Sequence, residues 1–215
     1  MSGAAPAPLT AADARALADC LATSGVAVFP ADTVYGLCCD PADEAAVGRL
    51  YELKGRPRER AAAIMFFALD DALPALSEAG PAQRDAAARL LPGAVTVLLA
   101  NPRGLYAAAC GGDEHTLGVR VPALPEHLAA LSSVHGPVLQ SSANLSGGAD
   151  ARRVEEIPAS ILDGADLVLD GGALPGIPST VVDLRGLAAG EGHRVLREGA
   201  VPAAQVARLL ARAPG

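Results

Sequence analysis

Aromatic residues are scarce in this 215-residue chain: they make up 3% of it, and tryptophan is absent. Proteins that bind single-stranded nucleic acid without sequence preference stack successive bases on aromatic rings, so this class is disfavoured. Basic residues are also fewer than acidic ones, and the formal net charge is -7. A general phosphate-binding surface is therefore not expected, and any anion site has to be a local cluster.

Long apolar runs are missing too, because no run approaches the roughly 18 residues needed to span a bilayer. The first ten residues, MSGAAPAPLT, lack the basic and apolar regions of a secretory signal peptide. We therefore expect no association with a membrane and a cytoplasmic location. Hydrophobic residues nevertheless make up 51% of the chain, which predicts a packed globular domain.

Cysteine and histidine spacings typical of metal or redox sites are absent. Cys20, Cys38, Cys39 and Cys110 include no C-x-x-C pair, and the four histidines have no metal-ligand spacing. No G-x-S-x-G, Walker or Rossmann motif occurs either, which disfavours a zinc enzyme and a hydrolase triad. Structural free thiols are the favoured interpretation, with a reactive thiol as the alternative. If Cys38 and Cys39 are extended, we expect one thiol to be buried and the other to face a cleft.

Apolar periodicity and turn residues predict a mixed α/β fold. Helices are expected over residues 10–24, 43–55, 71–91, 125–133 and 201–213, with a break at Gly80-Pro81. Strands are expected at 26–29, 61–67, 94–100, 117–122, 136–142, 165–170, 179–184 and 193–199. The stretch PADTVYGLCCD, residues 30–40, is predicted to connect a strand to a helix.

Helices alternate with strands in the first half of the chain, and strands dominate the second half. This order favours one twisted mixed β-sheet flanked by helices over a doubly wound parallel sheet. We predict a single domain over residues 10–213 after a flexible N-terminus, residues 1–9.

Two short polar segments follow predicted elements with the same spacing. In Lys54-Gly55-Arg56-Pro57, residues two apart would present two cations to one cleft, about 7 Å apart in extended chain. A phosphate site and a solvated basic turn both fit this segment. Ser142 and Asn144 place a hydroxyl and an amide on one face at a strand end. A ligand site and ordinary turn chemistry both fit that pair.

Three further residues stand out in the predicted strands. Arg120 lies between Val119 and Val121, so it shares a face with Gly118. An arginine on a buried face needs an anionic partner, and a protein carboxylate and a ligand are equally good candidates. Ser179 stands at a strand start, and Arg197 lies among apolar residues.

The order of seven short motifs is more specific than any one of them. PADTVYGL, KGRP, LPGAVTVLL, TLGVRVP, SSANLSGG, IPSTVVD and LREGAV together resemble the YrdC/Sua5 family of L-threonylcarbamoyladenylate synthases. The resemblance covers about residues 10 to 210. The chain is similar to the short, YrdC-like form, with no room for the extra C-terminal domain of the longer Sua5 type.

This resemblance implies an activity that composition cannot show. A family member with a YrdC-like fold and a concave ligand cleft would be a nucleotidyltransferase. It would convert L-threonine, bicarbonate and ATP into threonylcarbamoyl-AMP and pyrophosphate. Mg²⁺ would be bound mainly through ATP, without a dedicated protein carboxylate. A separate transferase complex would pass the threonylcarbamoyl group to tRNA to form threonylcarbamoyladenosine.

The resemblance also assigns roles to particular residues. Lys54 and Arg56 would be catalytic by neutralising the ATP phosphates. The ATP-binding set would comprise Lys54, Arg56, Arg60, Thr116, Ser142, Asn144 and Arg197. The L-threonine-binding set would comprise Thr33, Tyr35, Arg120 and Ser179, with Arg120 paired to the amino-acid carboxylate.

The chain departs from the family pattern at several positions. Ala31 stands where the family usually has threonine, Arg60 where it often has asparagine, and Met65 where many members have histidine. Asp150-Ala151-Arg152 replaces an S-x-T pattern. Met65 cannot donate a hydrogen bond to threonine, so the amino-acid side is altered more than the nucleotide side.

Two other functions follow from these departures and from the basic cluster. One is a YrdC-like paralogue that adenylates another carbamate or transfers a carbamoyl group, as the YrdC-like modules of hydrogenase maturation proteins do. The other is a module that binds tRNA or double-stranded RNA without synthase activity, since the family is also associated with RNA binding. Its sequence support is the cluster from Lys54 to Arg60.

Overall fold

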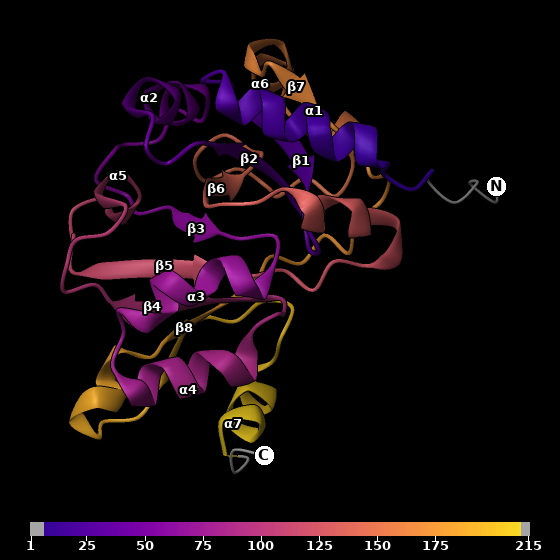
Figure 1. Ribbon diagram of the computed structural model, residues 1–215. Coiled ribbons are helices and arrows are strands. Elements are labelled where there is room, and N and C mark those ends of the chain that lie inside the picture. Colours follow the sequence, from indigo (N-terminus) through magenta and orange to yellow (C-terminus); the bar gives the residue numbers. More distant parts are fainter. Residues whose placement is uncertain (1–6, 212–215) are drawn as a thin grey trace.

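The computed structural model describes residues 7–211, in which nine strands form one mixed sheet (Figure 1). The strand order is β7-β1-β2-β6-β3-β5-β4-β8-β9. The strands are β1 Ala27–Pro30, β2 Tyr35–Cys39, β3 Ala63–Met65, β4 Val95–Ala100, β5 Thr116–Arg120, β6 Val138–Ser142, β7 Leu167–Val168, β8 Thr180–Asp183 and β9 Arg194–Arg197. The predicted mixed sheet is therefore confirmed.

Helices flank this sheet, as predicted. They are α1 Ala11–Ala22, α2 Glu44–Leu53, α3 Leu69–Ser77, α4 Pro81–Leu90, α5 Ala107–Cys110, α6 Ala159–Gly164 and α7 Ala203–Ala211, with 3₁₀ helices η1 Glu126–Ser133, η2 Val154–Glu156 and η3 Arg185–Ala189. Thr10 caps α1 in a capping box with Asp13, which explains why the helix begins there. The break predicted at Gly80-Pro81 within residues 71–91 is confirmed: α3 ends at Ser77, and Pro81 starts α4.

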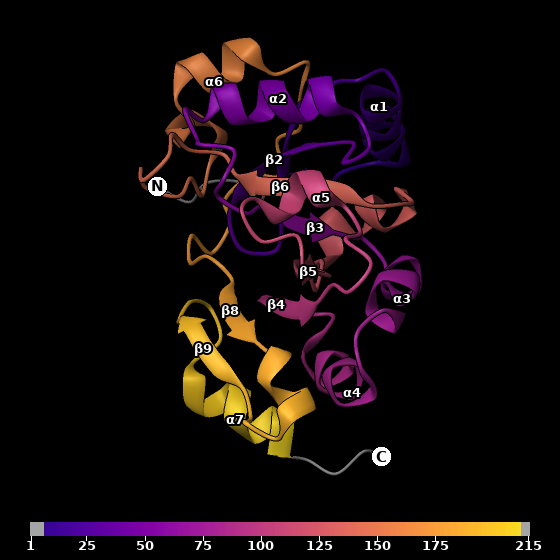
Figure 2. The ribbon, with the colours of Figure 1, turned by 90° about the vertical axis from the view of Figure 1, so that its left-hand side faces the viewer.

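The pleat of the central strands separates a core face from an open face. Leu139, Ile64, Val119 and Val97 are register partners across β6, β3, β5 and β4, and all four are fully buried. The next residues along the same strands point to the opposite side. Figure 2 shows α3 and α4 beside the β5–β4 half, while α1, α2 and α6 lie around the β1–β2 end. The sheet therefore has a side on which a ligand site can form.

The prediction for PADTVYGLCCD was wrong in one respect. Residues 31–34 form the turn of an antiparallel hairpin, and Tyr35–Cys39 is a strand between β1 and β6. The segment was missed because all five strand residues are buried, so no alternation of apolar and polar residues marks it. Cys38 and Cys39 are extended, yet both are fully buried, which corrects the expectation that one thiol faces a cleft.

The free cysteines are packing residues in this fold. Cys38, Cys39 and Cys110 are buried, and Cys20 is partly buried. Burial raises the pKa of the Cys39 thiol to about 12 and also raises that of Cys38. A thiol held protonated in this way is a poor nucleophile, which agrees with structural free thiols.

One long connection joins distant parts of the sheet. Residues 169–179, which we call the strap, leave β7 at one edge and enter β8 next to the opposite edge. The strap contacts the turn between β1 and β2, where the Gly176 amide donates to the Thr33 carbonyl at 2.9 Å. The strap ends at Ser179, which is one of the predicted site residues.

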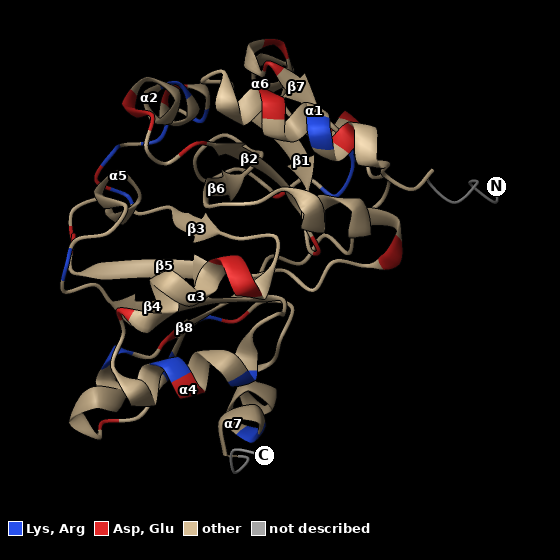
Figure 3. Cartoon of the chain, viewed as in Figure 1, with Lys and Arg blue, Asp and Glu red and all other residues tan. Residues whose placement is uncertain are grey.

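Between residues 7 and 211 no helix is both long and apolar enough to cross a membrane. The flexible N-terminus predicted over residues 1–9 and the helix predicted over 201–213 fall partly on residues 1–6 and 212–215, which lie outside the described residues. Figure 3 shows basic and acidic residues interspersed over the helices and loops of this view.

Candidate active site

A cavity of about 210 Å³ lies on the open face of the sheet. Four register partners, Gln140, Ala63, Gly118 and Leu98, line it from β6, β3, β5 and β4, and we call them the cavity floor. The other lining residues are Val34, Arg56, Ala61, Ala62, Thr96, Arg120, Ser141, Ser142, Asp150, Pro178, Ser179, Val181 and Arg197. Gly118 has no side chain, which keeps the middle of the floor open.

Five of the predicted site residues line this cavity: Arg56, Arg120, Ser142, Ser179 and Arg197. They come from segments far apart in the sequence, and the sheet order brings them together. Arg56 and Ser142 belong to the predicted nucleotide set, whereas Arg120 and Ser179 belong to the predicted amino-acid set. The cavity therefore brings residues of the two predicted sets together.

Arg120 lines the cavity, and protein groups hold one end of its guanidinium. Its Nη2 donates to Asp32 Oδ1 and, at 2.6 Å, to Thr33 Oγ1. The side chains of Arg120 and Asp32 are only 3% and 5% exposed. The buried Nε of Arg120 has no hydrogen-bond partner among the described residues. Asp32 and Thr33 thus hold the guanidinium in place, and the Nε–H is left without a protein acceptor.

A hydroxyl pair lies beside Arg120. Thr96 Oγ1 and Ser179 Oγ are 2.9 Å apart and buried, and Arg197 Nη2 donates to the Ser179 carbonyl at 2.8 Å. Thr96 shares a face with Arg120, because the two residues are register partners in β4 and β5. This cluster offers donors and acceptors suited to a small polar ligand.

Lys54 lies behind the cavity, where it organises the loop after β6. Its ammonium donates to the Asn144 carbonyl at 2.7 Å, to Asn144 Oδ1 at 2.9 Å and to the Ser142 carbonyl. The residue is 1% exposed, and burial, with a smaller effect of Arg56, lowers the pKa of its ammonium to about 8. The Ser142 hydroxyl in turn donates to Asn144 Oδ1 at 2.7 Å. Lys54 therefore fixes Ser142 and Asn144 relative to each other.

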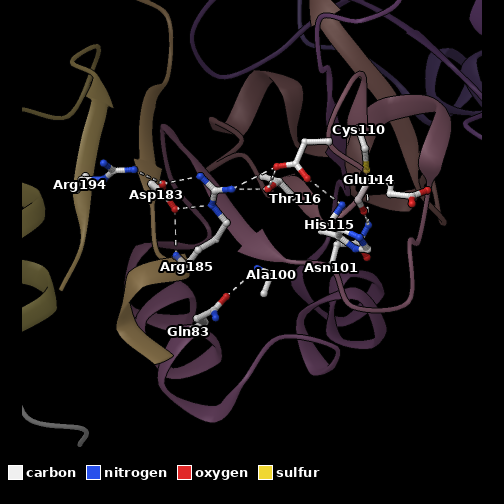
Figure 4. Close-up of polar contacts among 11 residues, drawn as sticks. Gln83, Ala100, Asn101, Cys110, Glu114, His115, Thr116, Asp183, Arg185 and Arg194 are labelled. Carbon is white, nitrogen blue, oxygen red and sulfur yellow. Dashed lines mark hydrogen bonds and ion pairs between the residues drawn. The ribbon is translucent and has the colours of Figure 1, made fainter. Parts of the chain in front are cut away.

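Besides Lys54, Asn144 and Thr33, three further predicted site residues are not among those that line the cavity. Thr116 donates to Asp113 Oδ2 at 2.6 Å and accepts from Arg185, within a cluster that includes Asp183 and Arg194 (Figure 4). The Tyr35 hydroxyl bonds Asp170 and the Gly172 carbonyl, both 2.9 Å away, so it holds the strap. Arg60 is exposed. Their assigned roles stay predictions.

Sequence reasoning missed Thr96, Gln140 and Asp150, which also line the cavity. Thr96 and Gln140 lie in strands whose residues are mostly buried, so the open face could not be recognised from alternation. The register with Arg120 would have identified Thr96. Asp150 was noted only as a departure from the family pattern, and its carboxylate accepts from Asn144 Nδ2 at 3.3 Å.

Among the residues that the structure describes, no group of three or more His, Cys, Asp or Glu could hold a metal ion. Asp150 is the acidic side chain among the residues that line the cavity. A metal bound here would thus take most of its ligands from a substrate and water.

Known proteins resemble this chain in both sequence and fold. Threonylcarbamoyl-AMP synthase from Idiomarina loihiensis is 32% identical over 155 residues, which cover 70% of this chain and 83% of that protein. The P. abyssi Sua5 structure complexed with L-threonine matches with a TM-score of 0.80 at 26% identity and 94% coverage of this chain, which spans 58% of that one. E. coli YciO matches with a TM-score of 0.76 at 26% identity, over 91% of this chain and 93% of its own.

The Sua5/YciO/YrdC family model, which carries the description telomere recombination, matches residues 19–199. This range includes the cavity floor, Arg56, Arg120, Ser142, Ser179 and Arg197. The chain therefore belongs to the Sua5/YciO/YrdC family.

Proposed function

We propose that this protein is a threonylcarbamoyl-AMP synthase, a nucleotidyltransferase that uses L-threonine, bicarbonate and ATP. The observation that carries the proposal is the single cavity that places Arg120 and its unpaired N–H on the same open face as Arg56 and Ser142. One end suits an amino-acid carboxylate and the other suits phosphates. The synthase names of relatives and the L-threonine bound in P. abyssi Sua5 support the assignment.

The reaction proceeds in two balanced steps. The amine nitrogen of L-threonine bonds to the bicarbonate carbon and a water molecule leaves, which gives a carbamate. A carbamate oxygen then attacks the α-phosphorus of ATP, the bond to the bridging oxygen breaks, and pyrophosphate leaves. Neither step needs a covalent enzyme intermediate, so the residues act by holding the reactants together and by stabilising charge.

Each cationic residue has a place in this scheme. Arg120, held by Asp32, binds the threonine carboxylate. The Ser179 and Thr96 hydroxyls form hydrogen bonds with the other polar groups of threonine. Arg56 and Arg197 neutralise phosphate oxygens. Lys54 acts by positioning Ser142 and Asn144, because its three protons are already donated to that loop.

Mg²⁺ fits this site as a partner of ATP. It would neutralise phosphate charge when bound, and the Asp150 carboxylate, which lines the cavity, would accept a hydrogen bond from its water. The remaining ligands would come from phosphate and water, as Mg²⁺ commonly prefers.

The experiment that tests the proposal is a product analysis. Purified protein is incubated with ATP, MgCl₂, bicarbonate and L-threonine, and the nucleotide products are identified by mass spectrometry while pyrophosphate is measured. We expect threonylcarbamoyl-AMP and pyrophosphate in equal amounts. Pyrophosphate release no greater than in a reaction without threonine would refute the proposal.

A paralogue that acts on another carbamate is the second candidate. It is favoured by the fully buried Met65, the register partner of Arg120 in the strand next to it, and by the fully buried Ala31 in the hairpin turn. Neither side chain can hydrogen-bond a threonine hydroxyl. Comparing turnover with L-threonine, L-serine and carbamoyl phosphate separates the two candidates.

The tRNA step and direct RNA binding are proposals of the same kind. A separate tRNA threonylcarbamoyl transferase complex would consume the product. Direct binding of tRNA would use the arginines between α2 and β3, of which Arg58 and Arg60 are exposed. A binding isotherm for tRNA without ATP should then weaken steeply as salt rises, and no binding at low salt would exclude it.

A further inference from the structure

The side chain of Gln140 carries a primary amide and lines the cavity. The residue is 7% exposed and forms part of the cavity floor. Within residues 7–211, none of the side-chain hydrogen bonds involves its amide. An amide that lines a cavity and has no protein partner is free to form hydrogen bonds with a polar ligand.

Gly36 in the neighbouring strand makes room for this amide. Gly36 is the register partner of Ser142, and a Cβ atom built on it would lie 3.0 Å from Gln140 Nε2 and 2.9 Å from the Phe29 ring. The long side chain of Gln140 therefore reaches from its own position toward the level of Ser142. Its amide can be packed there because residue 36 is a glycine.

The position of Gln140 lies between the two charged ends of the cavity. Along β6, Ser142 is two residues further on and on the same face, on the side proposed for the nucleotide. Across the sheet, Gln140 is in register with Ala63 on β3 and, through it, with Gly118 on β5. Arg120 lies two residues after Gly118 on the same face of β5. The floor residues at this level, Ala63, Gly118 and Leu98, offer no polar side-chain atom. Gln140 is therefore the polar side chain of the floor at the point where amino acid and nucleotide meet.

A primary amide suits a particular chemical group at this point. It offers N–H donors and a carbonyl acceptor side by side. A carbamate, the N-carboxylated amine of an amino acid, offers a complementary N–H and a carboxylate oxygen. A hydrogen bond to a charged oxygen is stronger than one between neutral groups.

We propose that Gln140 binds the carbamate group of the N-carboxylated amino acid and holds it between Arg120 and Ser142. The amide N–H donates to a carbamate oxygen and the amide carbonyl accepts from the carbamate N–H. This assignment rests on the proposed function and makes Gln140 a binding residue for the intermediate rather than for either whole substrate.

The test compares three variants in steady-state kinetics. Gln140→Met keeps the length of the side chain but removes its donors and acceptor, and Gln140→Glu keeps the shape but replaces the amide by an anion. Both should raise the KM for bicarbonate at least tenfold, while the KM values for ATP and L-threonine change less than threefold. Gln205→Ala, an exposed glutamine in α7, is the control and should change none of them.

A binding measurement keeps the proposal testable without turnover. By calorimetric titration, the wild-type protein should bind N-carbamoyl-L-threonine, a stable analogue of the carbamate. Gln140→Met should bind this analogue at least tenfold more weakly and bind L-threonine as the wild type does. Equal losses for both ligands, or no loss for either, would overturn the assignment of Gln140.

The two measurements distinguish this proposal from the proposed function. A wild-type protein that makes no threonylcarbamoyl-AMP, yet binds the analogue in a manner that depends on Gln140, would refute the synthase and leave the carbamate site standing. An active wild type whose Gln140→Met variant has unchanged bicarbonate kinetics would refute the carbamate site alone.

Discussion

The Lys54 ammonium lies 2.9 Å from Asn144 Oδ1 and ties the end of α2 to the loop after β6, ninety residues later in the chain. Replacing Lys54 with alanine removes every donor of this contact and leaves the Asn144 carbonyl without a partner, whereas the Ser142 carbonyl and Asn144 Oδ1 keep other donors. Such an unpaired group costs about 1–3 kcal/mol of folding free energy. We expect Lys54→Ala to lower the unfolding free energy in urea titrations and to lose most of the synthase activity. Unchanged stability would show that the loop does not depend on Lys54.

The Arg120–Asp32 pair gives a prediction about stability. Asp32→Ala leaves the buried Arg120 guanidinium without its carboxylate, and an uncompensated buried charge typically costs about 3–5 kcal/mol. Urea unfolding should show a loss of this size. Asp163→Ala, at an exposed carboxylate in α6, is the matched control and should change stability by less than about 0.5 kcal/mol. A loss below about 1 kcal/mol in Asp32→Ala would contradict the role assigned to Asp32.

A substitution at Gly118 is expected to affect the cavity without disturbing the fold. A Cβ atom there would lie 3.5 Å from the Ala62 carbonyl oxygen and from Leu98 Cδ2, which is ordinary contact. Gly118→Ala should therefore fold with a stability within about 1 kcal/mol of the wild type. The methyl group enters the cavity floor, where an extra methyl in a packed site costs about 1–3 kcal/mol, so kcat/KM should fall about tenfold or more.

The control for this prediction is Gly80→Ala, because a Cβ atom at Gly80 would meet nothing within 4 Å. It should leave kcat/KM unchanged. Wild-type activity in Gly118→Ala would mean that substrates do not approach the middle of the floor.

Asp183 makes acid stability dependent on the cluster in Figure 4. Hydrogen bonds from Arg185, whose Nε and Nη2 lie 2.9 Å from its two oxygens, lower the pKa of this carboxyl from 3.8 to about 2. Because the folded-state pKa is the lower one, the stabilisation is fully present above pH 3.8 and is lost as the pH falls through about 2.

Urea unfolding between pH 2 and pH 6 checks this pH dependence. The difference in unfolding free energy between the wild type and Asp183→Asn should be largest above about pH 4 and should shrink toward pH 2. A difference that does not vary with pH would mean that the charge of Asp183 has no part in the cluster.

The sequence predicted where the helices and strands lie better than it predicted which of their residues face the cavity. The strand that carries Arg120 and the strand end that carries Ser142 followed from apolar runs and turn residues. The role of Gln140 did not, because β6 is buried on both faces and its register with Gly36 and Ala63 depends on pairing between distant segments. Lys54 was expected to point at a ligand, since sequence alone cannot show that the loop at Asn144 folds back over it.

The strap is only slightly longer than the distance that it has to span. From Val168 to Thr180 the chain can extend over about 40 Å, while seven inter-strand spacings across a flat sheet amount to about 34 Å. Inserted residues only add slack, whereas each deleted residue removes about 3.3 Å of reach. Length variation within the strap should therefore be one-sided, with insertions tolerated and deletions of two or more residues pulling Ser179 away from Thr96.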